Sequence, residues 1–415
     1  MAPTDVVADE DLQRRRRPLG PGLLVTAAFI GPGTVVTASK AGAQEGCGLL
    51  WAVLFACAGA IVLQSLAARV GIVRGIGLGE AIRAAFGNSW LQKPIVALVV
   101  VAIGVGNAAY QTGNLTGAAK GIHAIAGGPL EVWIVLLAAL ACAILLVGGY
   151  RWMQRVLIAL VVLLSVSFLL AASAHPPSMG QVFRGLLPAR LHASDLTLVV
   201  ALLGTTIVPY NLFLHASGAA TTWNGVDHDI AIQQADRDTT LAIGLGGCVT
   251  ASILLTASAA YYEAGESWTG VDAIAAQLKP TLGGRSAAAF AAGLFAAGLT
   301  SSITAPMATA FALCGCLGLA SVPGSWPYRV FALGTVAVGA LFALLLGQSP
   351  ALTIVLAQAA NGLLLPIIAC FLLYVLIKTV GSSRALVGPL RLRLAQGVVA
   401  AVCLLGTWRI VSLFP

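Results

Sequence analysis

Apolar residues fill the chain in long blocks that are separated by short polar segments. A helix needs about 20 residues to cross the hydrocarbon core of a bilayer, and blocks of that length recur along the whole chain. The pattern therefore predicts an all-α polytopic membrane protein with about eleven transmembrane helices. We place these spans at 20–43, 47–70, 94–119, 130–149, 153–174, 196–220, 239–262, 285–316, 328–348, 350–378 and 394–413.

Two shorter segments between spans have an amphipathic pattern. RGIGLGEAIRAAFG (74–87) is expected to lie along the inner membrane surface, and WTGVDAIAAQLKPTLGG (268–284) along the outer surface.

Composition agrees with a membrane location. Hydrophobic residues make up 59% of the chain and charged residues 9%, whereas soluble domains have about 25% charged residues. The net charge of +8 is small for 415 residues, and with no polar domain to seat DNA or RNA it excludes nucleic acid as a partner. We expect a monomer embedded in the lipid bilayer of the cell (inner) membrane.

The basic residues predict the orientation. Arg14 to Arg17 precede the first span, and the positive-inside rule places the N-terminal tail (1–18) in the cytoplasm. An odd number of spans then puts the C-terminus outside. We expect no cleavable signal peptide, because the first apolar block is too long and follows this polar tail.

Two of the predicted spans are interrupted. FIGPGTVVTASKAG (29–42) contains Gly31-Pro32-Gly33, and GTTIVPYNLFLHAS (204–217) contains Pro209. Proline removes a backbone donor and glycine weakens a helix. The breaks lie in the first helix of spans one to five and the first helix of spans six to ten, and five is odd, so the second set runs inverted. Paired interruptions indicate a transporter binding site; the alternative is that each proline only kinks its helix.

Several motifs, in the right order over most of the chain, carry a family resemblance. GPGTVVTASKAGAQEGCGLLW (31–51) and LQSLAARVGIVRGIGLGEAIR (63–83) resemble the first two helices of the Nramp (natural resistance-associated macrophage protein) metal transporters. VPYNLFLHAS (208–217), AAGLTSSITAP (296–306) and LAQAANGLLLP (356–366) resemble family stretches in helices six, eight and ten.

The resemblance implies the leucine-transporter-like fold of the amino acid/polyamine/organocation superfamily. In that fold two inverted five-helix repeats leave helices one and six unwound at the substrate site. We expect repeat one at 19–175, repeat two at 195–379 and an eleventh helix at 394–413.

The metal ligands of the family are not matched. Its aspartate falls on Gly31, its asparagine on Thr34 and its methionine on Val208. The histidine falls on Tyr210, and of two glutamines in helix ten only Gln358 remains. The resemblance therefore implies a divergent member of the family, with no metal site of the usual kind. A dication without a countercharge is costly to hold at mid-membrane.

The proton path of the family also differs. Its helix-three D-x-x-E falls near Gly104 and Asn107, whereas His215 and Arg329 match family positions. Coupling to protons of the family's usual kind is therefore not expected, and the coupling ion, Na⁺ or H⁺, stays open. No cofactor is expected.

Without the aspartate, the backbone of the break favours negative charge. The N–H groups of Gly33, Thr34, Val35, Tyr210 and Asn211 lie at the starts of half-helices, where they lack helical partners and attract anions. Our main prediction is a transporter that carries a small organic solute with a carboxylate or similar acceptor group by alternating access. We expect its substrate-binding residues to be Gly31, Gly33, Thr34, Asn107, Val208, Tyr210, Asn211 and Gln358.

Other polar residues have two interpretations each. Asn107, Tyr110, Gln111 and Asn114 form a stripe that lines the cavity or bonds neighbouring helices. Lys40 attracts anions into the outer vestibule, or instead reaches the outer interface or pairs with Glu45. Hydroxyls near residue 300 lie where leucine-transporter-like folds place sodium, or cap backbone carbonyls. The gating or coupling candidates are Lys40, His215, Thr300, Ser301 and Arg329.

Two alternative functions stay open. One is a divalent metal carrier, for Mn²⁺ or Mg²⁺, that uses backbone carbonyls and side-chain oxygens in place of the lost ligands. The other is a membrane receptor that binds without transporting. An enzyme is not expected, because the sequence shows no paired carboxylate, metal cluster or activated nucleophile. We interpret the eight scattered cysteines as small core residues.

Overall fold

The computed structural model describes residues 30–87, 89–147, 151–174, 176–188, 195–346, 349–379 and 387–411. The tail predicted at 1–18 and the first part of the first span lie outside these residues.

The first half of the described chain follows the predicted order of spans. Its elements are α3 (Pro32–Glu45), the 3₁₀ turn η1 (Gly46–Leu49), α4 (Leu50–Arg74), α5 (Leu78–Ala85), α6 (Gln92–Ala126), α7 (Leu130–Val147), α8 (Arg151–Ala174) and α9 (Met179–Gly185).

The second half repeats this pattern of long helices and short surface elements. Its elements are α10 (Leu196–Thr206), α11 (Pro209–Thr222), α12 (His228–Ala257), the π-helical turn η2 (Ser258–Tyr262), η3 (Val271–Ala273), α13 (Ile274–Gln277), α14 (Lys279–Leu282), η4 (Gly283–Arg285), α15 (Ser286–Leu317), α16 (Trp326–Leu346), α17 (Pro350–Thr379) and α18 (Pro389–Val411).

The all-α prediction is confirmed, and the number of spans agrees with it. Nine helical segments of the described chain are long and apolar enough to cross a membrane. One of them, Pro32–Arg74, divides at η1 into α3 and α4, and α8 holds a shorter apolar helix at Ile158–Ala174. With α10 and α11 counted as one broken span, these make the expected set of about eleven. The amphipathic segments become α5 and the short helices from η3 to η4.

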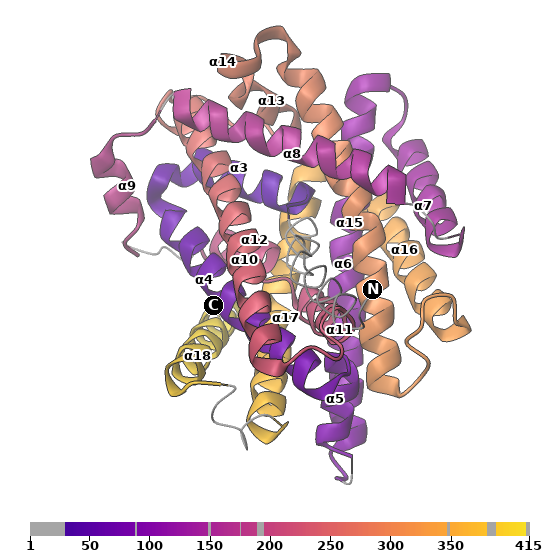
Figure 1. The fold of residues 1–415 in the computed structure, drawn as a ribbon. Coiled ribbons are helices and arrows are strands. Elements are labelled where there is room, and N and C mark those ends of the chain that lie inside the picture. The colour runs from indigo at the N-terminus through magenta and orange to yellow at the C-terminus, as the bar shows by residue number, and fades with distance from the viewer. Residues whose placement is uncertain are drawn as a thin grey trace, which may run out of the picture.

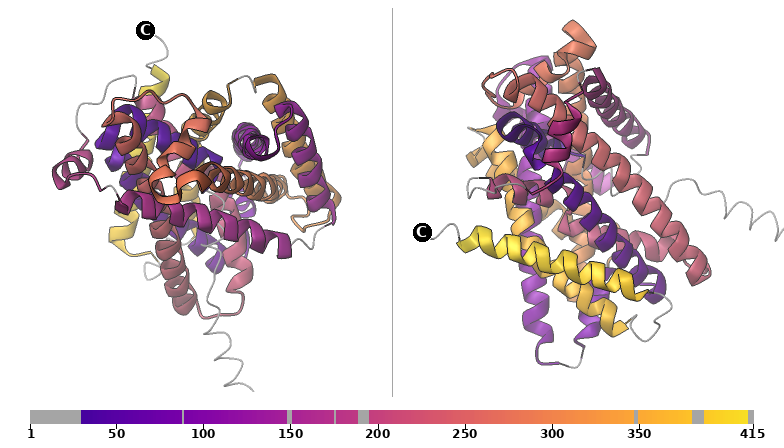
Figure 2. Two further views of the ribbon diagram at one scale, coloured as in Figure 1. Left: turned by 90° about the horizontal axis from the view of Figure 1, so that it is seen from above. Right: turned by 90° about the vertical axis from the view of Figure 1, so that its left-hand side faces the viewer.

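The helices form two packed groups (Figure 1). On one side, α6, α15 and α16 pack against one another. On the other side, α3 and α4 each pack against α12, while α10 and α17 lie between the two groups. The helix α18 runs obliquely along the outside of the bundle (Figure 2). On the outer faces large apolar side chains such as Val135, Leu341 and Leu404 are half-exposed or more, as expected for a surface solvated by lipid.

Small residues let the helices approach closely. A Cβ atom at Gly71 of α4 would lie 2.1 Å from the carbonyl oxygen of Ala216 in α11. A Cβ atom at Gly204 of α10 would lie 2.0 Å from the carbonyl oxygen of Gln358 in α17. Because lipid gives no hydrophobic drive between helices, this van der Waals contact is a main source of their association. The contact at Gly204 also holds α10 against Gln358, whose side chain covers Gly33 at the break in α3.

One buried ion pair joins three helices. Arg69 of α4 is 2% exposed and donates to both carboxylate oxygens of Asp236 in α12, each at 2.8 Å. Ser65 donates to Asp236 at 2.7 Å, and Arg391 of α18 pairs with the second oxygen at 2.5 Å. The bidentate geometry compensates a guanidinium that would be costly to bury alone.

The contact between α10 and α17 predicts the effect of a single methyl group. We expect Gly204→Ala to lower the stability of the protein by about 1–3 kcal/mol, because the added Cβ must push α17 away. Gly244→Ala is the matched control, since a Cβ at Gly244 of α12 meets nothing within 4 Å. Apparent melting temperatures in detergent compare the two variants, and equal values would contradict this account of the packing.

Candidate functional site

Both predicted breaks are present. α3 begins at Pro32, after an extended Gly31 with φ −112° and ψ −174°. On the other side, α10 ends at Thr206 and α11 begins at Pro209, with Ile207 and Val208 between them. The breaks are therefore changes of helix and more than proline kinks.

Fewer backbone N–H groups at the starts of α3 and α11 lack an acceptor than predicted. The N–H of Val35 donates to the Gly31 carbonyl at 3.2 Å, and the N–H of Asn211 donates to the Val208 carbonyl at 3.0 Å. The prediction was wrong for these two groups, because the residue before each proline already supplies the first helical acceptor. Within the described residues, the N–H groups of Gly33 and Tyr210 have no hydrogen-bond acceptor.

The end of α10 presents carbonyl oxygens to the break. The N–H of Ile207 still donates to Leu203, at 2.7 Å. Pro209 has no N–H, so the carbonyl of Thr205 lacks its helical donor. A helix C-terminus carries about half a negative charge, and here it points into the gap between α10 and α11.

Side chains from four helices surround the two breaks. The hydroxyls of Thr34 (α3) and Thr205 (α10) lie 2.7 Å apart. The amide of Gln358 (α17) covers Gly33, where a Cβ atom would lie 2.2 Å from its Nε2. On α15, the Ser301 hydroxyl lies 2.9 Å from the Cβ position of Gly31. The structure thus brings together the predicted residues Gly31, Gly33, Thr34, Ser301 and Gln358.

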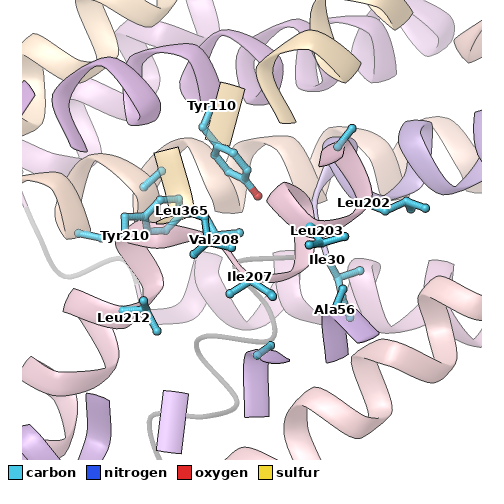
Figure 3. Close-up of a cluster of buried hydrophobic side chains, with 14 of the residues drawn as sticks. Ile30, Ala56, Tyr110, Leu202, Leu203, Ile207, Val208, Tyr210, Leu212 and Leu365 are labelled. Atoms are coloured by element: carbon cyan, nitrogen blue, oxygen red, sulfur yellow. The ribbon is translucent and has the colours of Figure 1, made fainter. Parts of the chain in front are cut away.

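Two tyrosines close the site on the side of α6. Tyr110 (α6) and Tyr210 (α11) meet edge to face, with ring centroids 5.3 Å apart and planes at 72° (Figure 3). Both are fully buried, and Val208 lies beside them in the segment between α10 and α11. These residues of the site are therefore shielded from solvent.

Buried amides at this depth lack partners. Neither amide atom of Asn211, Gln358 or Asn361 has a hydrogen-bond partner among the described residues, and all three side chains are at most 1% exposed. Buried polar groups are nearly always satisfied, so orphaned amides indicate the place of a ligand or water. Sequence reasoning missed Thr205 and Asn361. Their signals were their spacings, three residues before Val208 and three after Gln358.

The polar stripe on α6 divides between its two interpretations. Asn107 donates to the Thr309 hydroxyl at 2.6 Å, and Gln111 donates to the Ser302 carbonyl at 3.2 Å, so both bond α6 to α15. Tyr110 instead faces the break. Asn107 thus contributes to helix packing, and a substrate contact for it stays a prediction.

The gating candidates are dispersed. His215 is buried on α11, with its Nδ1 2.8 Å from Oε1 of Gln64. The Thr300 hydroxyl donates to the carbonyl of Ala296 at 2.8 Å, so it caps a backbone carbonyl as in the second of its two interpretations. Lys40 is partly exposed on α3, and Arg329 is exposed at the start of α16 near Gly324. Only Ser301 among these candidates lies against a break.

The site is electrically neutral in its side chains. The residues that meet at the break carry hydroxyls, amides and phenols, and in the described part of the chain no three His, Cys, Asp or Glu side chains come together as a metal cluster. Its charge complementarity comes from the ends of half-helices: donors at α3 and α11, acceptors at α10.

Comparisons with known proteins support the resemblance. The family model described as "Natural resistance-associated macrophage protein-like" matches residues 22–412. The chain is 29% identical over 410 residues to the "Divalent metal cation transporter MntH" of Acidiphilium cryptum, covering 94% of this chain and 89% of that protein. It is 31% identical over 361 residues to the protein of the same name in Brucella suis biovar 1, covering 84% and 77%.

Solved structures confirm the fold. The crystal structure of the Eremococcus coleocola manganese transporter in complex with an aromatic bis-isothiourea substituted compound is similar with a TM-score of 0.68 at 21% identity, covering 95% of this chain and 94% of that chain. Mhp1, a nucleobase-cation-symport-1 family transporter, is similar with a TM-score of 0.58 at 17% identity, covering 96% and 93%. The leucine-transporter-like fold is therefore confirmed.

The unpartnered, buried amide of Gln358 is expected to lower the stability of the folded protein. We expect Gln358→Met to raise stability by about 1 kcal/mol or more, because it removes a buried polar group without a partner. Asn107→Leu is the control and should lower stability, since it leaves the Thr309 hydroxyl without its donor. Thermal unfolding in detergent measures both, and a fall with Gln358→Met would show that its amide bonds are structural.

Proposed function

The chain belongs to the Nramp family of secondary transporters, and we propose that it carries a divalent metal cation, with the ion held at the break by neutral oxygens. The observation that carries this proposal is the convergence of oxygen ligands from different helices on one closed site. The hydroxyls of Thr34 and Thr205 and the amide oxygen of Gln358 are the proposed ligands that contact the break in α3 or its partner. The carbonyl at the end of α10 and the buried, unpartnered amide of Asn211, two residues after Pro209, are proposed with them.

Donor chemistry supports a hard cation. Mg²⁺ and Mn²⁺ accept carbonyl, hydroxyl and amide oxygens, and Mg²⁺ keeps several of its own waters. The place of a soft sulfur ligand in the family is occupied by Val208, which offers none. The relatives that match over most of the chain are named divalent metal cation transporters, which supports the same class of substrate.

The missing carboxylate has a consequence for affinity. Each ion must lose part of its hydration to a site whose countercharge is only the partial negative charge of a helix end. We therefore propose weak, partly hydrated binding and rapid release, in place of tight capture.

A second candidate is a small organic solute with a carboxylate. It is favoured by the N–H groups of Gly33 and Tyr210, which have no acceptor among the described residues, and by the neutral side chains of Thr34, Thr205 and Gln358 at the break. The amide of Gln358 weakens this candidate, because it already fills the approach to Gly33. The two candidates require opposite charges on the substrate.

The proposal keeps the organisation expected from the sequence. It has inverted repeats at 19–175 and 195–379, an eleventh helix at 394–413, a cytoplasmic N-terminus and a location in the inner membrane. The duplicated breaks, which open α3 and α11 each with a proline, support the repeats.

Restoring the lost charge tests the proposal. We expect Gly31→Asp to tighten Mn²⁺ binding about tenfold or more, because it adds a countercharge within a few ångströms of the proposed ligands. A Cβ at Gly31 would meet the movable Ser301 hydroxyl at 2.9 Å, so the side chain needs only a small shift there. Gly180→Asp adds the same charge at an exposed position of α9 and should leave binding unchanged.

Isothermal titration and Mn²⁺ uptake into proteoliposomes provide the readouts. Wild-type uptake of Mn²⁺ or Mg²⁺ that falls with Asn211→Leu supports the metal carrier. Uptake of an organic acid without any metal flux, abolished by Gly31→Asp, would replace it with the second candidate.

A further inference from the structure

A large apolar cavity lies apart from the break, between α6, α16 and α17, with α15 contributing Thr309 and Leu313. Its volume is about 1020 Å³. That is the upper end of the range for pockets that bind drug-sized ligands. α6 and α16 run side by side in this part of the bundle (Figures 1 and 2).

The cavity exists because small residues face it. α6 contributes Gly104, Ala108 and Thr112, four residues apart and hence on one face of the helix. α16 contributes Gly334. A Cβ atom at Gly104 or at Gly334 would meet nothing within 4 Å, so larger side chains at these two positions would occupy the space.

The four threonines that line the cavity have no hydroxyl proton left to donate to an occupant. The hydroxyls of Thr112, Thr335 and Thr353 donate to carbonyls of the protein, at 2.9, 2.8 and 2.8 Å. The Thr309 hydroxyl donates to Ala305 and accepts from Asn107. Since these donors are engaged and most of the other lining residues are apolar, the chemistry that fits the cavity is mainly hydrocarbon.

The cavity opens toward the membrane. Val105, Leu345 and Leu352 line it on three different helices and are 59%, 64% and 51% exposed. All three lie on spans that the bilayer surrounds. An empty space here would leave its lining without dispersion contacts on one side, whereas lipid chains are the hydrocarbon in direct reach.

We propose that the cavity is a lipid site, in which a phospholipid of the bilayer inserts one acyl chain between α6, α16 and α17. The acyl chain would contact Ala357 of α17. The next residue, Gln358, lies at the break and is a proposed ligand, so the lipid site borders the helix that carries it. Gly104 also lies near the place of an acid in the family's helix three. The site does not depend on which substrate the transporter carries.

Lipid retention tests this site. Native mass spectrometry after detergent exchange is expected to find a phospholipid retained by the wild type and lost from the double variant Gly104→Leu, Gly334→Leu. Gly244→Leu is the control, because Gly244 also has open space before it but lies on α12, away from the cavity. It should retain the lipid. Equal retention by the double variant and the wild type would overturn the proposal.

A second measurement uses the unaltered protein. Electron cryo-microscopy in nanodiscs of phospholipids with dibrominated acyl chains should place bromine density inside the cavity. A cavity that is closed by approach of α16 to α17, or that holds no such density, would overturn the site even if the double variant failed to fold.

Discussion

Backbone groups that lose their helical partners inside a membrane must be satisfied by protein, because lipid offers neither donors nor acceptors. This constraint organises the structure around the interruptions before Pro32 and Pro209. Each interruption lies where several helices meet: α6, α15 and α17 close around α3, α10 and α11. Gly204 and Gly71 make that enclosure possible, since they let α10 and α4 touch neighbouring backbones. The break therefore determines both the packing and the position of the site.

The chemistry at the break follows from what the enclosure leaves unsatisfied. Neutral oxygens, an orphaned amide and the end of α10 meet there, and the described residues form no cluster of three or more His, Cys, Asp or Glu side chains. Such a site binds through many weak polar contacts in place of one strong charge. That arrangement favours an ion that keeps part of its hydration, and it avoids the cost of a permanent carboxylate at mid-membrane. The pair of Arg69 and Asp236 shows the contrast: where this protein does bury full charges, it pairs them with bidentate geometry.

Much of the fold was predictable, because span length and helix breaks are local properties of the sequence. Apolar blocks of membrane length predicted the helices, and the prolines predicted the two interruptions. The site was predictable in part. Gly33, Thr34 and Gln358 were expected together from the order of the family motifs, and the structure brings them into contact. Which N–H groups remain free was not predictable, because it depends on the residue at which each half-helix starts. α3 starts at Pro32 and α11 at Pro209, so the N–H groups of Val35 and Asn211 already have acceptors.

The roles of individual polar residues on long helices were also beyond the sequence. Asn107 and Tyr110 lie one turn apart, yet one bonds α15 and the other faces the break. That difference comes from the rotation of α6 against its neighbours, which periodicity alone does not specify. Thr205 was missed for the same reason, because only the approach of α10 to α3 gives it a partner.

The most direct test is the location of the ion itself. Crystals grown with Mn²⁺ and measured at the manganese absorption edge should show an anomalous peak between Thr34, Thr205 and Gln358. A map with no peak there, together with density for a carboxylate against the Gly33 N–H, would contradict the neutral cation site.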